Sequence, residues 1–410
     1  MAEGRRPELR AVRLPEPYEP EFAPGGYRVE VVRERSALQA LAPEWTRLNA
    51  EAAIEHPFLS HEWLCTWWDC FGAGKALHVI LVRAGGRLVG VAPLVRSEER
   101  MYGVKVRCLH APYNPHVPRF EFVALDDAEG VYRAIWQHLR DTSQEWDALR
   151  LSQVPADSDL MRRLPGMAAE DGFFLGTWYG ERSPHLLIHR DFDDYERGLA
   201  RAHRKNIRSR LKRLERLGRV ELEVIAEDAR LDELLSEGFR IEAAAWKAEH
   251  GTAIVSQPEI ERFYRSLAAR VAPQGRLRLY FLTVDGARIA FSYALYNRNR
   301  IYSLKVGYDP AFRRYSPSTV MCYLALRHAF ESGLKEYDFL GNDEPWKVEW
   351  SPKVRAHEWL FVLPPRWRGR WIAAVKFHWL PRLRRSRLYA LLGKRPPPPV
   401  GKPEPEDDSH

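Results

Sequence analysis

The chain alternates strand-like and helical stretches in a similar order twice, and this repeated order most constrains its fold. Each pass contains two apolar, alternating runs joined by a glycine turn, Gly85-Gly86 in the first and Asp285-Gly286 in the second. Such turns are typical of β-hairpins, because glycine tolerates the left-handed backbone of a two-residue connection. The pattern predicts an α/β protein in which helices flank a mixed, mostly antiparallel sheet.

The apolar periodicity places the individual elements. Strands are expected at 27–32, 78–83, 88–95, 104–110, 148–154, 220–225, 277–284, 288–296, 300–308, 336–340 and 357–363, with a hairpin-like region at 173–189. Helices are expected at 36–50, 60–70, 130–141, 201–219, 231–249, 259–271 and 316–332. The two halves share little sequence identity, so an internal duplication is a structural hypothesis.

A length of 410 residues predicts two or three domains. We expect a disordered lead-in at 1–26, a first domain at 27–190 and a second at 191–364. A basic, tryptophan-rich segment at 365–395 and a disordered, proline-rich and acidic tail at 396–410 would follow.

The net charge of +8 comes from two short segments. Residues 201–219 carry a net +8 and residues 366–395 a net +10, which leaves −10 for the rest of the chain. The distribution therefore favours a phosphate-bearing donor and an anionic membrane as partners over DNA. On the first segment, a solvated helix face and an anion-binding face are equally consistent with the pattern.

The tail segment interleaves tryptophans with ten cations and no acid. Such a segment suits an anionic membrane surface, and a helix packed back onto the acidic body is the alternative. The four cysteines form no metal-ligand spacing, so no metal is expected. Without a signal peptide or a long apolar run, the expected location is the cytoplasm, with a peripheral position on the inner membrane face as the membrane alternative.

The densest chemical signal lies between residues 306 and 353. Ser316-Pro317 marks a helix start, because serine is a preferred N-cap and proline suits the first helical position. A helix N-terminus presents free N–H groups and attracts anions such as a pyrophosphate. The candidate anion-binding residues are Arg313, Arg314, Ser316, Ser318 and Thr319. A capped helix beside two solvated arginines is the alternative.

Downstream, Asp338 ends a strand and is followed by a glycine turn with further acidic residues and a lysine. Asp338 and Asp343 could act as general bases, and Lys347 could hold an anionic group. Open α/β sheets bind ligands at the carboxyl ends of their strands, which is where these residues stand. A glycine turn with a surface salt bridge is the alternative.

The order strand, basic turn, long helix, strand and Gly/acid/aromatic/Lys turn resembles the acyl-CoA-binding half of GNAT acyltransferases. The segments RRYSPST and EYDFLGNDEPWKVEW look like those of CelD/BcsL-type acetyltransferases, which in turn resemble Fem-type aminoacyl-tRNA-dependent transferases. HPFLSHEWLCTWWDCFG, VGVAPLV and RAHRKNIRSRLKRLERLG extend the resemblance to about residues 28–363.

The resemblance implies two tandem GNAT-like domains, with acyl transfer from acetyl-CoA or another acyl-CoA in the second. The acceptor would be an amine or hydroxyl of a glycan, lipid or peptide in cell-envelope or exopolysaccharide synthesis. In typical GNAT enzymes a glycine-rich loop cradles the pyrophosphate, whereas here Ser316 and Ser318 replace both glycines around Pro317. Proline lacks an N–H donor and serine hinders close backbone approach. Aminoacyl-tRNA as donor, or a non-catalytic scaffold, are therefore the alternatives.

Substrate contacts are expected at four further positions. Lys205 lies on the basic helix and Tyr308 ends a strand, beside the expected donor site. His110 and Asn114 belong to a proline-rich stretch in the first half and are expected to contact the acceptor. Trp63, Trp67 and Phe71 form a helical stripe that predicts core packing in the first domain, and an aromatic ligand platform is the alternative.

Overall fold

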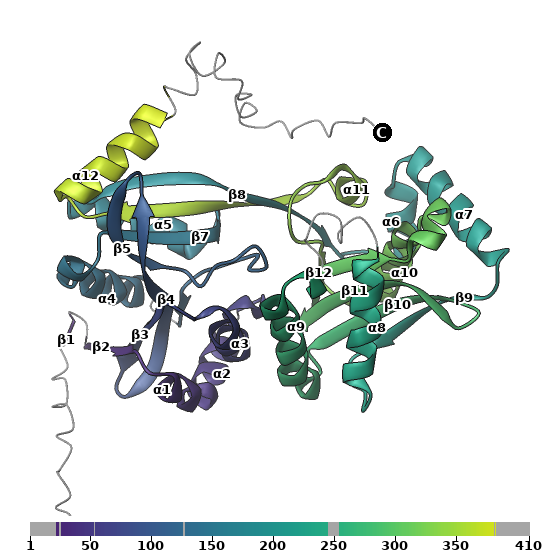
Figure 1. The fold of residues 1–410 in the computed structure, drawn as a ribbon, viewed down its shortest axis with the longest axis horizontal. Helices are drawn as coiled ribbons and strands as arrows, with labels where there is room; N and C mark the ends of the chain where they lie inside the picture. The colour runs from purple at the N-terminus through teal and green to yellow at the C-terminus, as the bar shows by residue number, and fades with distance from the viewer. Residues whose placement is uncertain are drawn as a thin grey trace, which may run out of the picture.

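The computed structural model describes residues 22–23, 26–52, 54–125, 128–244, 254–380 and 382 (Figure 1). Of the end predicted to be disordered at 1–26, only residues 22–23 and 26 are among the described residues. The end predicted to be disordered at 396–410 and residues 383–395 of the basic segment lie outside them. Within the described part, no helix is long and apolar enough to cross a membrane.

The first half of the chain builds a sheet with helices packed against it. Its strands are β1 (Phe22–Ala23), β2 (Tyr27–Val32), β3 (Ala76–Ala84), β4 (Arg87–Met101), β5 (Val104–His110), β6 (Val123–Ala124), β7 (Ala148–Pro155) and β8 (Phe174–Leu187). Its helices are α1 (Arg35–Ala40), α2 (Ala42–Glu51), α3 (His61–Phe71), α4 (Ala128–Asp141) and α5 (Asp159–Glu170). Helix α3 begins where the Ser60 hydroxyl accepts a hydrogen bond from the Trp63 N–H, as its N-cap residue type favours.

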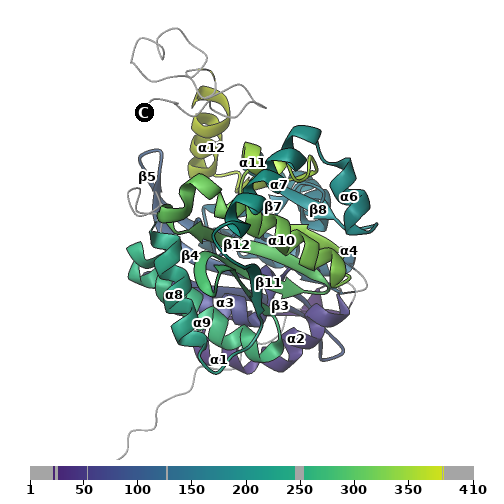
Figure 2. The same ribbon diagram turned by 90° about the vertical axis from the view of Figure 1, so that its right-hand side faces the viewer.

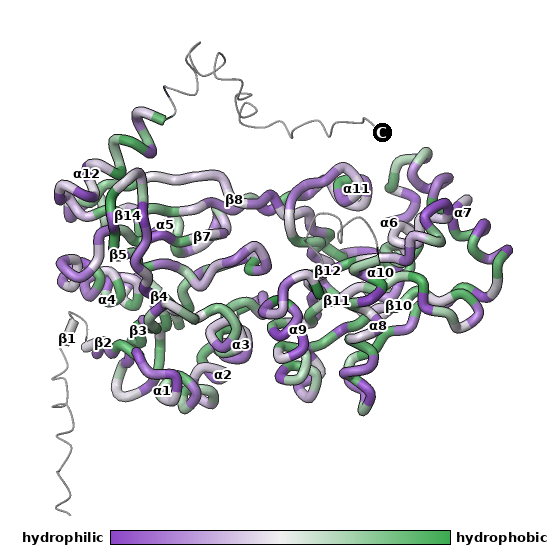
Figure 3. The backbone as a smooth tube through the Cα atoms, viewed as in Figure 1, coloured by the Kyte–Doolittle hydropathy of each residue, from purple (hydrophilic) through white to green (hydrophobic). Residues whose placement is uncertain are grey.

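The second half also builds a sheet with helices packed against it, but its helices and strands differ in length from those of the first half. Its helices are α6 (Phe192–Gly198), α7 (Arg201–Glu215), α8 (Leu231–Ala243), α9 (Pro258–Val271), α10 (Pro317–Glu331), α11 (Pro345–Val348) and α12 (Trp367–Ala373). Its strands are β9 (Val220–Ile225), β10 (Leu277–Val284), β11 (Ala287–Asn297), β12 (Arg300–Tyr308), β13 (Glu336–Asp338) and β14 (Val354–Leu363). Figure 3 shows the apolar strands β3 and β10 in green and the largely hydrophilic helix α7 in purple.

The fourteen strands of the described residues join one sheet that runs through both halves, in the order β1-β2-β3-β4-β5-β7-β14-β8-β13-β12-β11-β10-β9, with β6 on β4. Among these strands, the pairs β5–β7 and β12–β13 are parallel and the others are antiparallel. The predicted class, a mixed and mostly antiparallel sheet flanked by helices, is therefore confirmed. The second hairpin turn has the expected left-handed backbone, with φ of +48° at Asp285 and +80° at Gly286.

The two halves exchange strands at their junction. Strand β14 comes from the predicted second segment but pairs with β7 and β8, and β8 continues into pairing with β13 (Figures 1 and 2). Residues 173–189, predicted as a hairpin, form this single long strand instead, because its partners come from distant parts of the chain. Helix α5, which was not predicted, precedes it.

A shared aromatic core also joins the halves. Trp63 and Trp67 of α3 are 3% and 0% exposed and belong to one buried cluster with α8, α9 and strands β10 and β11. The Trp63 ring meets Phe263 of α9 edge to face, with ring centroids 5.2 Å apart. The stripe predicted on α3 is thus a core, but one that lies between the halves.

The basic tail begins with a helix packed on the first half. Ile372 of α12 is fully buried against Val106 and Cys108 of β5. Gly176 of β8 leaves no room for a Cβ beneath the ring of Phe377 in the π-helical turn Ala374–Trp379. The tryptophans point elsewhere: Trp367, Trp371 and Trp379 are 64%, 40% and 47% exposed.

Replacing Trp63 by alanine should lower the free energy of unfolding by about 3–5 kcal/mol, because a buried indole leaves a cavity between the halves. Urea denaturation measures this change. Trp367→Ala is the matched control and should change stability by less than about 1 kcal/mol, since its ring is 64% exposed. Equal losses in the two variants would contradict the placement of Trp63.

Candidate active site

A cleft opens in the second half where β12 and β13 separate. The two strands pair only from Arg300↔Glu336 to Tyr302↔Asp338, yet β12 continues to Tyr308. The chain then turns away from β12 through Leu340 and Gly341, which both have left-handed backbones with φ of +53° and +64°. The separation leaves a cavity of about 450 Å³.

The cleft has an apolar interior and a polar rim. Its walls come from β12, from the first two turns of α10 and from the chain 337–347. Cys322 of α10 lines it, but burial raises the pKa of this thiol far above its ordinary value, so a thiolate nucleophile is absent at neutral pH.

The N-terminus of α10 stands at the cleft with cations around it. Ser316 is the N-cap residue, but it adopts a left-handed backbone (φ +51°) and its side chain makes no capping hydrogen bond. Ser318 and Thr319 line the cleft, whereas Arg313 and Arg314 are exposed on the preceding 3₁₀ turn. The predicted anion-binding residues therefore gather at one helix end, which carries partial positive charge.

Helix α7 brings further cations to the start of α10, beyond the anion-binding residues predicted from the sequence. Arg210 Nη1 donates a hydrogen bond of 2.7 Å to Thr319 Oγ1. The Arg213 guanidinium lies 5.7 Å from the ring centroid of Tyr315. Tyr315 belongs to the same 3₁₀ turn as Arg314. The basic helix thus meets the start of α10, although the spacing of 109 residues between Arg210 and Thr319 gave no local signal of the contact.

Asp338 is fully buried, and its carboxylate is occupied. Oδ2 accepts from Arg119 Nη2 at 2.7 Å and from Arg355 Nη1 at 2.8 Å. Oδ1 accepts from Ser183 Oγ at 2.8 Å and from the Leu340 N–H at 2.9 Å. Burial alone would raise the pKa of Asp338, but the two guanidinium groups hold it below the ordinary value. Such a carboxylate is a weak proton acceptor and a strong anchor.

Asp343 and Lys347 lie on the turn after β13. Asp343 Oδ2 accepts a hydrogen bond of 2.8 Å from Arg182 Nε at the surface. Lys347 is 7% exposed, and its Nζ donates to the Leu340 carbonyl at 2.7 Å and to the Asn342 carbonyl at 3.2 Å. The lysine therefore holds the turn that forms one wall of the cleft.

The four predicted substrate contacts fall in different places. Tyr308 lines the cleft, and Lys205 is exposed on α7. His110 is 3% exposed on β5, and burial lowers its pKa to about 4. Asn114 Oδ1 accepts a hydrogen bond of 2.9 Å from the His116 N–H in the loop after β5. The structure brings Tyr308 to the predicted anion-binding residues, while His110 and Asn114 belong to the first half.

The described residues hold no group of three or more His, Cys, Asp or Glu side chains arranged to bind a metal ion.

The partners of Asp338 were missed by sequence reasoning. Arg119 lies 219 residues away on a loop, and no pattern near it distinguishes it from a surface arginine.

Asp338→Asn should destabilise the protein by about 3–5 kcal/mol, because it leaves two guanidinium groups without their shared carboxylate. Asp343→Asn, the matched control, should cost no more than about 1 kcal/mol because its ion pair is exposed. Chemical denaturation at several pH values measures both effects. Since the pKa of Asp338 is depressed on folding, the difference between wild type and Asp338→Asn should be full at neutral pH and shrink as the pH falls below about 3.9. A constant difference at all pH values would contradict the ion-pair assignment.

Comparison with known proteins shows which families and solved structures this chain is similar to. Residues 201–348 match the acetyltransferase (GNAT) domain family. No curated protein matches the sequence. FemX superposes with a TM-score of 0.56 at 14% identity, over 77% of this chain and 95% of FemX.

A second solved structure is the C-terminal DUF2156 domain of an Agrobacterium fabrum protein named as a lysylphosphatidylglycerol synthetase. It superposes with a TM-score of 0.51 at 13% identity, over 84% of this chain and 96% of that domain. At these identities the likeness concerns the fold. Residues 201–348 are therefore similar to a GNAT acetyltransferase domain, and the chain has a two-part fold that FemX shares.

Proposed function

We propose that the protein transfers an acyl group from acetyl-CoA or a longer acyl-CoA to an amine or hydroxyl. The observation that carries this proposal is the cleft between β12 and β13, with the N-terminus of α10 and its arginines at its rim. The match of residues 201–348 to the acetyltransferase domain family supports an acyl-CoA donor.

In this proposal the donor's phosphates lie at the start of α10. Ser318 and Thr319 present the helix end, and Arg210, Arg313 and Arg314 supply positive charge. Pro317 removes one N–H donor from this end, so side-chain cations replace part of the usual backbone cradle.

The acyl thioester would enter the apolar part of the cleft. The acceptor nitrogen or oxygen attacks the thioester carbonyl carbon, the C–S bond breaks, and the thiol leaves with a proton. Asp338 and Lys347 position the wall of the cleft through their bonds to Leu340 and to the following turn. Asp343 remains a candidate proton acceptor at the surface of that turn.

We further propose an acceptor in cell-envelope or exopolysaccharide synthesis, as in the CelD/BcsL-type resemblance. Support comes from the shared architecture with FemX and with a protein named as a lysylphosphatidylglycerol synthetase. The FemX likeness and the exposed cations of α7, Lys205 among them, also favour aminoacyl-tRNA as a second candidate donor. Sensitivity of the activity to ribonuclease separates this donor from acyl-CoA.

Acetyl-CoA at a hundred times its dissociation constant should stabilise the protein by about 2.7 kcal/mol and raise its melting temperature. Arg210→Ala should weaken acetyl-CoA binding by about 10-fold in calorimetry, because a charge-assisted contact to phosphate is lost. Arg216→Ala is the control, since this exposed arginine lies at the C-terminal end of α7. Absence of any thermal shift with acetyl-CoA, longer acyl-CoAs or free coenzyme A would contradict the proposed donor.

The exposed tryptophans of the tail support peripheral membrane binding. Replacing Trp367, Trp371 and Trp379 together by alanine should strongly reduce flotation with anionic vesicles, because these rings are exposed among cations. Neutral vesicles provide the control for the electrostatic part. Unchanged flotation of the triple variant, or of a chain lacking 366–395, would contradict membrane binding through this segment.

A further inference from the structure

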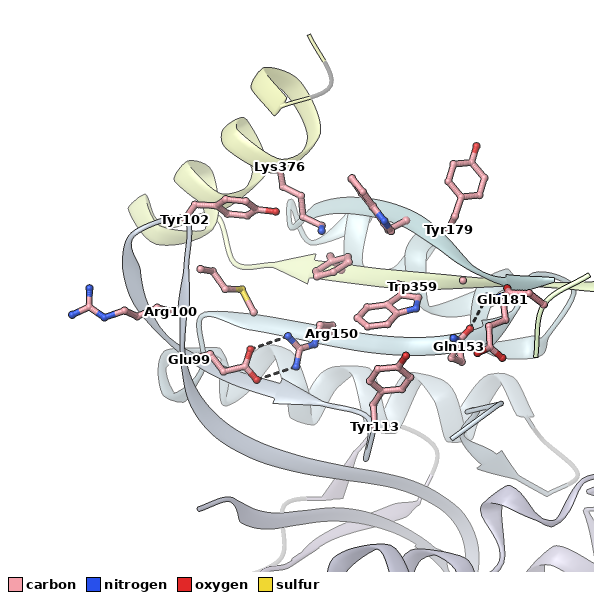
Figure 4. A pocket seen from close by; sticks show the side chains of 15 residues that line it. Glu99, Arg100, Tyr102, Tyr113, Arg150, Gln153, Tyr179, Glu181, Trp359 and Lys376 are labelled. Carbon is pink, nitrogen blue, oxygen red and sulfur yellow. Dashed lines mark hydrogen bonds and ion pairs between the residues drawn. The ribbon is translucent and has the colours of Figure 1, made fainter. Parts of the chain in front are cut away.

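The first half contains a second large cavity, separate from the donor cleft. This groove has a volume of about 630 Å³ and lies between the β4–β5 hairpin and strands β7, β8 and β14 (Figure 4). Lys376 from the tail reaches over it, with its Nζ 4.3 Å from the Trp178 ring centroid. The groove therefore has walls from the start, middle and end of the chain.

The lining of the groove combines aromatic rings with paired polar groups. Tyr113 and Trp359 meet edge to face with ring centroids 4.8 Å apart, and Tyr179, which is 66% exposed, is a further lining residue of the groove. Arg150 makes two hydrogen bonds to the Glu99 carboxylate, at 2.8 and 2.9 Å. Glu99 therefore neutralises this arginine, while Arg100 and Lys376 are further cations of the lining. Flat apolar rings between hydrogen-bonding groups match a sugar ring, whose faces carry C–H groups and whose edges carry hydroxyls.

Glu181 stands where the groove meets the donor cleft. It lines the groove, and it also lines a small cavity of about 90 Å³ together with Leu304, Lys305, Leu340 and Gly341. Those four residues also line the donor cleft. Glu181 therefore lies between the groove and this small cavity, which shares four lining residues with the cleft and is called the passage below.

The backbone around Glu181 is irregular in three adjacent strands. The β8–β14 register shifts between Ala356 and Glu358, opposite Gly180 and Glu181. A Cβ at Gly180 would lie 2.6 Å from Gln153 Oε1 and 2.9 Å from the His357 backbone. Gln153 itself has a φ of +56°, and its Oε1 accepts a hydrogen bond of 2.9 Å from the Glu181 N–H. Bulges of this kind redirect side chains and occur next to active sites.

The surroundings of Glu181 raise the pKa of its carboxyl group to near neutral pH. Burial raises its pKa to about 7, with Glu344 and Asp338 adding to the rise and Lys347 opposing it. His116 lines the passage, and the His357 ring contacts the Glu181 backbone carbonyl, but burial lowers the pKa of each histidine to about 3, so both are neutral. Lys305 on β12 also lines the passage, and Arg119 bonds to the His357 ring at 3.3 Å.

We propose that the groove binds a saccharide acceptor and that Glu181 accepts the proton from the attacking hydroxyl or amine at the passage into the donor cleft. This inference rests on the proposed acyl-CoA-dependent function. It assigns the proton acceptor to the first half, whereas the sequence motif pointed to carboxylates of the second.

The reaction balances without a further reactant. The acceptor's O–H or N–H bond breaks as its proton passes to the Glu181 carboxylate, and the freed electron pair forms a bond to the thioester carbonyl carbon. The C–S bond then breaks, and the leaving thiolate takes up the proton from Glu181. The products are the acylated saccharide and free coenzyme A, and the carboxylate is regenerated.

The test uses the full chain with acetyl-CoA and two probe acceptors, cellohexaose for hydroxyls and a glucosamine hexamer for amines. Thiol release and mass spectrometry measure the transfer. We expect the wild-type rate to rise with pH through about 7, because the carboxyl group must be ionised to accept a proton. Glu181→Gln should lower kcat by about 10²- to 10⁴-fold and abolish this rise, and Glu181→Asp should restore part of the rate.

Two further measurements separate catalysis from structure. Glu181→Gln should raise the melting temperature at pH 8, because it removes a buried charge, and should leave the acetyl-CoA thermal shift unchanged. Tyr179→Ala should raise the KM for the saccharide by about 2- to 10-fold while kcat changes little. Glu233→Gln on α8, an exposed glutamate, is the control and should behave as wild type.

The outcomes distinguish this inference from the proposed function. Acetyl-CoA binding without transfer to either hexamer would overturn the saccharide groove and leave the donor assignment standing. Transfer by Glu181→Gln at a rate within about 3-fold of wild type, with an unchanged pH profile, would overturn the role of Glu181. Failure of acetyl-CoA to bind at all would instead remove the proposed function on which the inference rests.

Discussion

The buried carboxylate of Asp338 is the point on which both halves of the structure depend. Through Arg119, Arg355 and Ser183 it ties together a loop of the first half, strand β14 and strand β8. Through the Leu340 N–H it also directs the chain that leaves β13 away from β12. Because β13 ends there, β12 continues without a partner on that side, although it stays paired with β11, and the cleft opens beside it. One ionic cluster therefore both joins the halves and shapes the cleft.

This junction explains why the groove and the cleft beside β12 lie close together. Strand β8 runs from the groove wall to the pairing with β13, so it carries Glu181 to the passage between the two cavities. The aromatic core between α3 and α9 fixes the same two halves on another side. The two cationic segments also have separate places: α7 meets the N-terminus of α10, and the tail packs over β5 and β8. A net charge of +8 therefore says less about partners than the positions of these two segments.

Sequence patterns predicted most of the elements, because apolar periodicity, caps and glycine turns are local. The hairpin at Asp285-Gly286 and the helix start at Pro317 are examples. The exchange of β14 into the first half was missed, since strand pairing between distant segments leaves no local pattern. The same reason hid the partners of Asp338, whose position at the end of a strand suggested a reactive carboxylate rather than an anchor. Glu181 was missed because only the pairing of β8 with two distant strands brings it to a cavity.

The most direct measurement is a structure of the full chain bound to a non-hydrolysable analogue of acyl-CoA. Such an analogue carries both the pyrophosphate and the acyl carbonyl. We expect the pyrophosphate at Ser318 and Thr319 beside Arg210, the acyl carbonyl between β12 and the 340–347 turn, and Glu181 at the open side of that carbonyl. A donor bound outside this cleft, or an acyl carbonyl that the passage from Glu181 does not reach, would contradict the arrangement.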